Sequence, residues 1–269
     1  MRRRPRIWAA LLLFAGLGSV LLAAQEGYQW YRRRGPEFSP AEANEKSEFY
    51  WSRLRYSSRY GGYGYGFRFG GGSWSRDYPK ADRQFLMALK RLTRIRARST
   101  EQVVDLDSDE IFNYPWVYAV QVQTWTFTDA EAKRLRDYLL KGGFLMVDDF
   151  HGTADWPRFM EGMRIVFPDR QVEELGDKDE IFHVLFDLSE RFQVPGEQYV
   201  MTGRTYEKDG YVPHWRAIRD DKGRIMVAIC YNMHLGDAWE WADMPEYPEK
   251  FAALAFRLGL DYIMYGMTH

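Results

Sequence analysis

Two acidic residues and a histidine follow a short apolar run in the middle of the chain. The run covers residues 144–147, and Asp148, Asp149 and His151 come just after it. A carboxylate whose pKa is raised by a neighbouring carboxylate can act as a general base, with the histidine beside it. A carboxylate in this position can also accept backbone N–H bonds and cap the next helix. We favour the structural role for Asp148 and leave both roles open for Asp149.

A second polar cluster lies near the C-terminus and contains Asn232, Asp237 and Trp239. Gly236 allows a tight turn before Asp237, and the indole ring of Trp239 offers a flat surface of the kind that stacks on sugars. Ordinary packing of this tryptophan is the competing interpretation. The sequence thus gives two catalytic candidates, Asp149 and His151, and four candidate ligand-binding residues, which are Asp148, Asn232, Asp237 and Trp239.

Metal and thiol chemistry receive less support from the sequence. None of the five histidines has the i, i+4 spacing of a helical zinc pair. His151 with Asp149 and Asp237 could complete a mixed metal site, but a histidine near a strand end is more often a hydrogen-bonded structural residue. The single cysteine, Cys230, cannot form an intramolecular disulfide. We therefore predict no metal ion and no cofactor.

The elements that must position these side chains follow an alternating pattern. Strands are predicted at residues 49–56, 103–106 and 116–122 and at the central apolar run, and helices at 79–98 and 129–140. Thr128 and Glu131 form a capping box at the start of the second helix. This alternation predicts a three-layer α/β domain with a mostly parallel sheet and helices on both faces. Both polar clusters follow strand ends, so we expect them at the same edge of the sheet.

The C-terminal part of the chain adds further elements. A helix is predicted to open at Trp156-Pro157, and residues 181–186 read as a short buried run. Residues 215–219 and 224–231 predict a β-hairpin that turns at residues 220–223. Residues 232–246 read as a loop, and a last helix is expected from about 248 to 258.

The N-terminus predicts export. Residues 1–24 combine four arginines, an apolar stretch from residue 7 to 22 and small residues at the end, as in a signal peptide. An uncleaved membrane anchor is the alternative. Residues 25–48 read as a linker and residues 49–269 as one α/β domain. We therefore expect a periplasmic or secreted protein that contacts the membrane only through an uncleaved N-terminus.

Charge and glycine are concentrated in the first part of the domain. Residues 53–98 contain twelve arginines and lysines against Asp77 and Asp82, while the remainder is acidic. This asymmetry can mark a polyanion-binding face or two halves that attract one another; we favour the second and expect no nucleic-acid partner. Residues 59–74 interleave glycines with aromatic residues and arginines. They could stack on ligands, but a surface loop packed back onto the domain is favoured.

Several blocks of the sequence resemble the family catalogued as domain of unknown function 4159, whose members are bacterial envelope proteins. The blocks span roughly residues 49–269 and are Gly70–Trp74 with Asp77–Pro79, Gly142–Leu145 with Val147–Phe150, Ile181–His183, Gly223-Arg224, Asn232 with Leu235–Glu240, and Tyr265–His269. The chain departs from the pattern that we expect at Tyr231, where a histidine is expected, and at His234, where an aspartate is expected.

The resemblance implies a flavodoxin-like fold related to the class I glutamine amidotransferases. In that fold a nucleophilic cysteine lies on the turn after a central strand. The matching turn here, Val147–Gly152, contains no cysteine, and Cys230 lies far along the chain. Glutaminase activity needs the thiolate, so we do not expect it.

Three functions remain open. The leading prediction is an exported domain that binds a small polar or carbohydrate-like ligand, or an envelope partner, at the carboxyl edge of the sheet. The second is a hydrolase that uses Asp149 as base with His151, with or without a metal ion. The third is an envelope assembly module whose basic segment, residues 53–98, docks on an acidic partner.

Overall fold

The computed structural model describes residues 46–59 and 73–269. The predicted signal peptide, nearly all of the predicted linker and most of the glycine-rich segment lie outside these residues. Within them, no helix combines the length and the apolar character needed to cross a membrane.

Seven strands form one mixed sheet in the order β2-β1-β3-β4-β7-β6-β5. The first five strands in this order run parallel, whereas β6 is antiparallel to both β7 and β5. The strands are β1 Ser52–Arg55, β2 Gln102–Asp105, β3 Trp116–Val120, β4 Phe144–Asp148, β5 Glu173–Glu174, β6 His214–Arg219 and β7 Ile225–Tyr231. The predicted α/β class with a mostly parallel sheet is confirmed.

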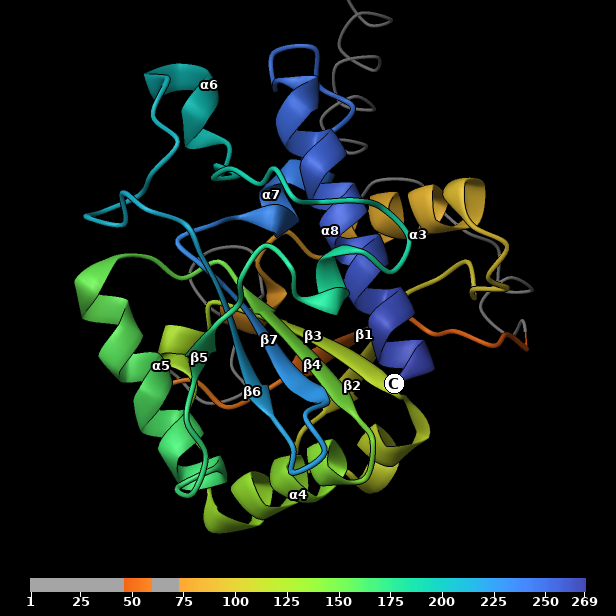
Figure 1. Ribbon diagram of the computed structural model, residues 1–269, viewed down its shortest axis with the longest axis vertical. Coiled ribbons are helices and arrows are strands. Elements are labelled where there is room, and N and C mark those ends of the chain that lie inside the picture. Colours follow the sequence, from red (N-terminus) through yellow and green to blue (C-terminus); the bar gives the residue numbers. More distant parts are fainter. Residues whose placement is uncertain (1–45, 60–72) are drawn as a thin grey trace, which may run out of the picture.

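Helices cover both faces of the sheet (Figure 1). The α-helices are α3 Lys80–Leu92, α4 Asp129–Leu140, α5 Gly152–Val166, α6 Gln198–Thr202, α7 Leu235–Glu240 and α8 Glu249–Thr268. Short 3₁₀ turns are η1 Ser73–Ser75, η2 Asp109–Asn113, η3 Val122–Thr124 and η4 Glu180–Phe182. Helices α3, α7 and α8 pack together on one face, and α4 and α5 pack together on the other.

Alternate residues of the central strands supply the two halves of the core. In β3, Trp116 and Tyr118 point to the α3–α7–α8 side, whereas Val117 and Ala119 point to the α4–α5 side. All residues of β3, β4 and β7 are buried, because helices cover both faces of these strands. The site described below is thus carried by strands that are buried on both faces.

A local sequence signal explains where helix α4 begins. Helix α4 starts with the predicted capping box, in which the Thr128 hydroxyl accepts from the Glu131 N–H and the Glu131 carboxylate accepts from the Thr128 N–H.

Two predictions are wrong. Of residues 181–186, which read as a short buried run, only Ile181 and Phe182 are buried, and residues 232–246, which read as a loop, include the short helix α7. Helix α8 also continues to Thr268, ten residues past its predicted end.

Candidate functional site

The chain turns sharply at the carboxyl ends of three neighbouring strands. Gln121, Asp149 and Asn232 directly follow β3, β4 and β7, and all three have left-handed backbone conformations, with φ of 54°, 56° and 63°. This conformation is uncommon for residues other than glycine. The turns bring the segments after the strands together at one edge of the sheet, as predicted.

Asp149 is the centre of the site and is 1% exposed. Its Oδ2 accepts a hydrogen bond from the side-chain amide of Gln121. Its Oδ1 lies 3.4 Å from Nε2 of His151, and its Oδ2 lies 3.3 Å from Nε2 of His234. Burial opposes ionisation, but the charge of His234 and the contacts with His151 and Gln121 outweigh it and lower the pKa of Asp149. Asp149 is therefore an anion between two imidazole rings.

His151 precedes helix α5 and is fixed through its backbone. Its N–H donates to Oδ2 of Asp155 at 3.0 Å, and this carboxylate also pairs with Lys208. The ring is 3% exposed, and neither of its nitrogens has a hydrogen-bond partner in the described chain. A buried ring with two unpartnered nitrogens is unusual, since buried polar atoms are normally bonded.

Glu207 reaches the site from the loop between α6 and β6. Its Oε1 lies 3.8 Å from Nε2 of His151 and 3.6 Å from Nδ1 of His234. Burial opposes ionisation, but the contact with His234 and the charges of His151, His234 and Lys208 lower the pKa of Glu207 to about 2. Its side chain is 31% exposed, so the site meets solvent on the Glu207 side.

The loop that carries Glu207 is held in place by hydrogen bonds between residues that follow Glu207 and other parts of the chain. The backbone N–H and the hydroxyl of Thr153 both donate to Asp209. The carbonyl of Gly210 accepts from Gln193, and the carbonyl of Val212 accepts from Asn232. These bonds attach the loop to the start of α5 and to the end of β7, so the position of Glu207 is defined by the sheet edge.

His234 lies between two further carboxylates. Its Nε2 is 3.0 Å from Oδ2 of Asp77, and its Nδ1 is 3.2 Å from Oδ2 of Asp237. Burial favours the neutral ring, but Asp149, Asp237 and Asp77 outweigh it and raise the pKa of His234 well above its usual value. The positive ring thus partly compensates a strongly negative site.

Several acids around His234 have raised pKa values. Burial and the nearby charge of Asp77 raise the pKa of Asp237 well above its usual value. Burial, Asp77 and Asp237 raise the pKa of Glu240 to about 9. Burial is also the largest cause that raises the pKa of Asp148, to about 7. These raised pKa values reflect burial and the concentration of negative charge around His234.

One arginine adds positive charge at the exposed side of the site. Arg76 precedes Asp77 and is itself exposed. Partial desolvation lowers the pKa of Arg76, but the charges of Asp77, Asp149, Asp237 and Glu207 outweigh it and the net shift is upward. Its guanidinium thus lies in the field of the site carboxylates.

The structure assigns different roles to the residues predicted from the sequence. Asp149, His151 and Asp237 are brought together around His234. Asn232 acts as a clamp, because its Oδ1 accepts from the N–H of Gly152 at 2.9 Å and its amide donates to Val212. Oδ2 of Asp148 accepts from the Tyr118 hydroxyl and the Gly236 N–H, both at 3.0 Å, as expected for a structural role.

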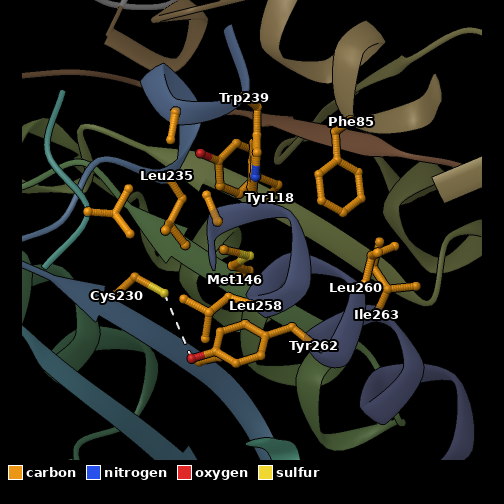
Figure 2. Packing of buried hydrophobic residues seen from close by; sticks show 14 of the residues in the cluster. Phe85, Tyr118, Met146, Cys230, Leu235, Trp239, Leu258, Leu260, Tyr262 and Ile263 are labelled. Atoms are coloured by element: carbon orange, nitrogen blue, oxygen red, sulfur yellow. Dashed lines mark hydrogen bonds between the residues drawn. The ribbon is translucent and has the colours of Figure 1, made fainter. Parts of the chain in front are cut away.

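The position of Trp239 corrects one sequence prediction. This side chain is fully buried and packs against Trp51, Phe85 and Tyr118, as Figure 2 shows for the last two. Helix α7 turns this residue toward the core, so no face of the indole ring is open to a ligand. We therefore omit Trp239 from the site.

Three site residues were not predicted. Asp77 and His234 lie within or beside the sequence blocks quoted above, but they were given no role there. Glu207 lies in a loop without any pattern that would single it out. The only available signal was residue type, since His234 is one of five histidines in the chain.

Among the residues that the structure describes, two groups of side chains could hold a metal ion. Asp149, His151, Glu207 and His234 each offer a ligand atom, and these four atoms lie within 4.8 Å of one another. Asp77, His234 and Asp237 form a second group of the same kind that shares His234. A surface cavity of about 610 Å³ lies elsewhere, at the other edge of the sheet, and is lined by Gly142, Gly223 and Arg224 among others.

Backbone strain in the described residues is concentrated at this site. Five non-glycine residues of the described ranges have positive φ: Asp77, Gln121, Asp149, Lys208 and Asn232. Two are site carboxylates, and the others support them or adjoin Glu207. Such strain persists only where the surrounding structure enforces it, and it is characteristic of functional sites.

The fold and the site together define an α/β protein with a buried histidine–carboxylate site at the carboxyl edge of its sheet. Residues 58–267 match the family described as Domain of unknown function (DUF4159), and the chain belongs to this family. No curated protein matches the sequence.

Proposed function

We propose that this protein is a hydrolase whose catalytic groups are Asp149, His151 and His234. One observation carries the proposal. The two oxygens of one buried carboxylate each face an imidazole nitrogen, at 3.4 Å for His151 and 3.3 Å for His234. A carboxylate beside an imidazole orients the ring and stabilises the imidazolium that forms when the ring accepts a proton.

In the proposed mechanism, water is the nucleophile. The imidazole of His151 removes a proton from the water molecule as the water attacks, and Asp149 stabilises the resulting positive ring, which then gives the proton to the leaving group as the scissile bond breaks. A thiol nucleophile is not required, and Cys230 is unsuited to that role because burial raises the pKa of its thiol well above its usual value. Substrate and water would enter beside Glu207, which is the partly exposed member of the cluster.

The hydrolase replaces simple ligand binding as the leading hypothesis for a structural reason. A carbohydrate-binding surface needs an accessible aromatic face, and Trp239 is in the core. The residues around Asp149 are instead acids and histidines, which are suited to proton transfer. A polar substrate therefore fits the site better than an apolar one.

Two expectations from the sequence are kept as proposals. We propose a relationship to the class I glutamine amidotransferase fold, supported by the left-handed conformation of Asp149 on the turn after central strand β4. We also propose export to the cell envelope, supported by the basic and apolar composition of residues 1–24.

The hydrolase proposal can be tested with chromogenic substrates. Purified protein is assayed with p-nitrophenyl acetate, bis-p-nitrophenyl phosphate and a set of p-nitrophenyl glycosides, alongside the variants Asp149→Asn and Asp107→Asn. Asp107 is exposed and follows edge strand β2, three strand positions from β4, so its variant is the matched control. We expect Asp149→Asn to lower kcat/KM by about 100-fold or more. Equal turnover in the Asp149→Asn variant and the control, or no turnover of any substrate by the wild type, would contradict the proposal.

A further inference from the structure

We infer that Asp149, His151, Glu207 and His234 bind one divalent transition-metal ion, with zinc as the best match. The inference rests on the proposed function in that it assigns a cofactor to the same residues. The argument depends on the spacing of the donor atoms, on which atoms lack partners, and on what supports each ligand.

Three of the distances between the donor atoms are close to the edge lengths of a coordination tetrahedron, and all four atoms lie within 4.8 Å of one another. Zinc binds nitrogen and oxygen at about 2.0–2.2 Å, so two ligands at a tetrahedral angle lie about 3.3–3.6 Å apart. His151 Nε2 is 3.4 Å from Asp149 Oδ1 and 3.8 Å from Glu207 Oε1, and Glu207 Oε1 is 3.6 Å from His234 Nδ1. These distances are long for hydrogen bonds but suit atoms that share one ion.

The nitrogens that would bind the ion are the ones without partners. Among the described residues, no hydrogen bond reaches either nitrogen of His151 or Nδ1 of His234. The two histidines are only 3% and 5% exposed, so bulk water does not compensate for the missing bonds. His151 Nε2 faces Asp149 and Glu207, and His234 Nδ1 faces Glu207 and Asp237, so unpartnered nitrogens of two buried rings converge on Glu207 and leave a place for a cation.

Asp77 completes the arrangement behind His234. Histidines that bind metal usually donate their other ring N–H to a carboxylate, which fixes the tautomer. Nε2 of His234 lies 3.0 Å from Oδ2 of Asp77, so Nδ1, which no hydrogen bond reaches within the described chain, can bind the ion when it loses its proton. Asp77 is therefore a positioning residue in this site.

The donor set identifies the class of ion. Calcium and magnesium prefer oxygen donors, whereas two imidazoles with two carboxylates suit zinc and its neighbours among the divalent transition metals. Glu207 is the most exposed of the four ligands and lies on a loop, so an entering water or substrate could replace it. Zinc lowers the pKa of a bound water to about 7, which is the chemistry that a hydrolase needs.

Metal content and spectroscopy test the inference without any activity assay. The full chain is stripped with a chelator and titrated with Zn²⁺ by calorimetry, and the retained metal is measured by mass spectrometry. We expect one zinc per chain, and a Co²⁺-loaded sample should give the intense visible bands of a tetrahedral site. Affinity for zinc should fall by more than 100-fold in His151→Ala and in His234→Ala.

Two further variants keep the test decisive. His183→Ala removes a histidine outside the site and should bind zinc as the wild type does. Glu207→Gln changes a partly exposed side chain, so it should fold even where the histidine variants do not, and it should weaken zinc binding by about tenfold or more. A wild type that binds no zinc, or Glu207→Gln and folded histidine variants that bind zinc as tightly as His183→Ala, would overturn the inference.

The outcomes also separate this inference from the proposed hydrolase. Asp149-dependent hydrolysis by a protein without zinc would overturn the metal site and leave the hydrolase intact. Stoichiometric zinc without hydrolysis of any substrate would support the metal site and contradict the hydrolase.

Discussion

His234 and Asp77 are 157 positions apart in the sequence, and Nε2 of His234 lies 3.0 Å from Oδ2 of Asp77. The contact depends on a glycine, because a Cβ atom at Gly236 would lie 2.6 Å from the same Asp77 oxygen. It connects the segment before α3 to the start of α7. The carboxylate of Asp77, which is distant from His234 in the sequence, thus fixes the orientation of the His234 ring.

Replacement of Asp77 by asparagine should weaken the site without unfolding the protein. The amide can still occupy the space, but it removes the charge that orients His234. We expect zinc affinity to fall by about 10- to 100-fold, the range typical of residues that support a metal ligand. Calorimetric titration of Asp77→Asn against Asp107→Asn checks this, and equal affinities would show that Asp77 does not position the ring.

Replacement of Asp209 by alanine should lower activity, because it should displace Glu207. Asp209 accepts two bonds from Thr153 and so attaches the Glu207 loop to α5. Without these bonds the loop should sample other positions, and we expect kcat/KM to fall by about tenfold while the circular dichroism spectrum stays unchanged. Asp221→Ala removes another exposed carboxylate at a distant turn and is the control. Unaltered kinetics in Asp209→Ala would mean that the loop is held by its other contacts.

Replacement of Trp239 by alanine should reduce stability. The side chain is fully buried between Trp51, Phe85 and Tyr118 (Figure 2), so its removal leaves a large cavity. We expect the free energy of unfolding to fall by about 3–5 kcal/mol, as for other large-to-small core substitutions, and less in Trp239→Phe. Chemical denaturation measures this, and a stable Trp239→Ala protein that had lost only ligand binding would contradict the structural role.

The stability of the protein should fall as pH rises through the titration of Asp261. This carboxyl accepts from the N–H groups of Leu185 and Phe186, yet burial raises its pKa from 3.8 to about 6. Between these values the native state binds more protons than the unfolded state, so stability declines as pH increases from about 4 to above 6.

Asp261→Asn isolates this contribution. Asparagine keeps an acceptor oxygen for both N–H groups but carries no charge. After allowance for partial solvent screening, we expect the variant to gain about 1–2 kcal/mol over the wild type at pH 8, and little at pH 4. Thermal denaturation at the two pH values tests this. A gain of the same size at both pH values would exclude titration of Asp261 as the cause.

The fold was largely predictable because its signals are local. Apolar runs bounded by turn residues gave β3 and β4, and the Thr128–Glu131 capping box gave α4. The rule that parallel strands share a carboxyl edge correctly predicted that the segments after β4 and β7 meet. The predicted lengths of the elements were less accurate, since α8 continues past residue 258, where its amphipathic first half ends.

The site was only partly predictable because its other half depends on tertiary contacts. Glu207 is placed by bonds from Thr153, Gln193 and Asn232 to the loop around it, and none of these is visible as a sequence pattern. The orientation of Trp239 depends on which face a six-residue helix buries, and so short a segment has no clear period. Charged residues in loops gave no indication of their distant partners.

The five left-handed residues around the site have a consequence for protein engineering. At Asp77, Gln121, Asp149, Lys208 and Asn232 a glycine would adopt the observed backbone more easily, by about 1 kcal/mol each. A screen for heat resistance alone would therefore tend to substitute glycine at these positions, and would remove two acidic side chains of the site along with the strain. Thermal tolerance and activity should thus trade off most sharply at this edge of the sheet.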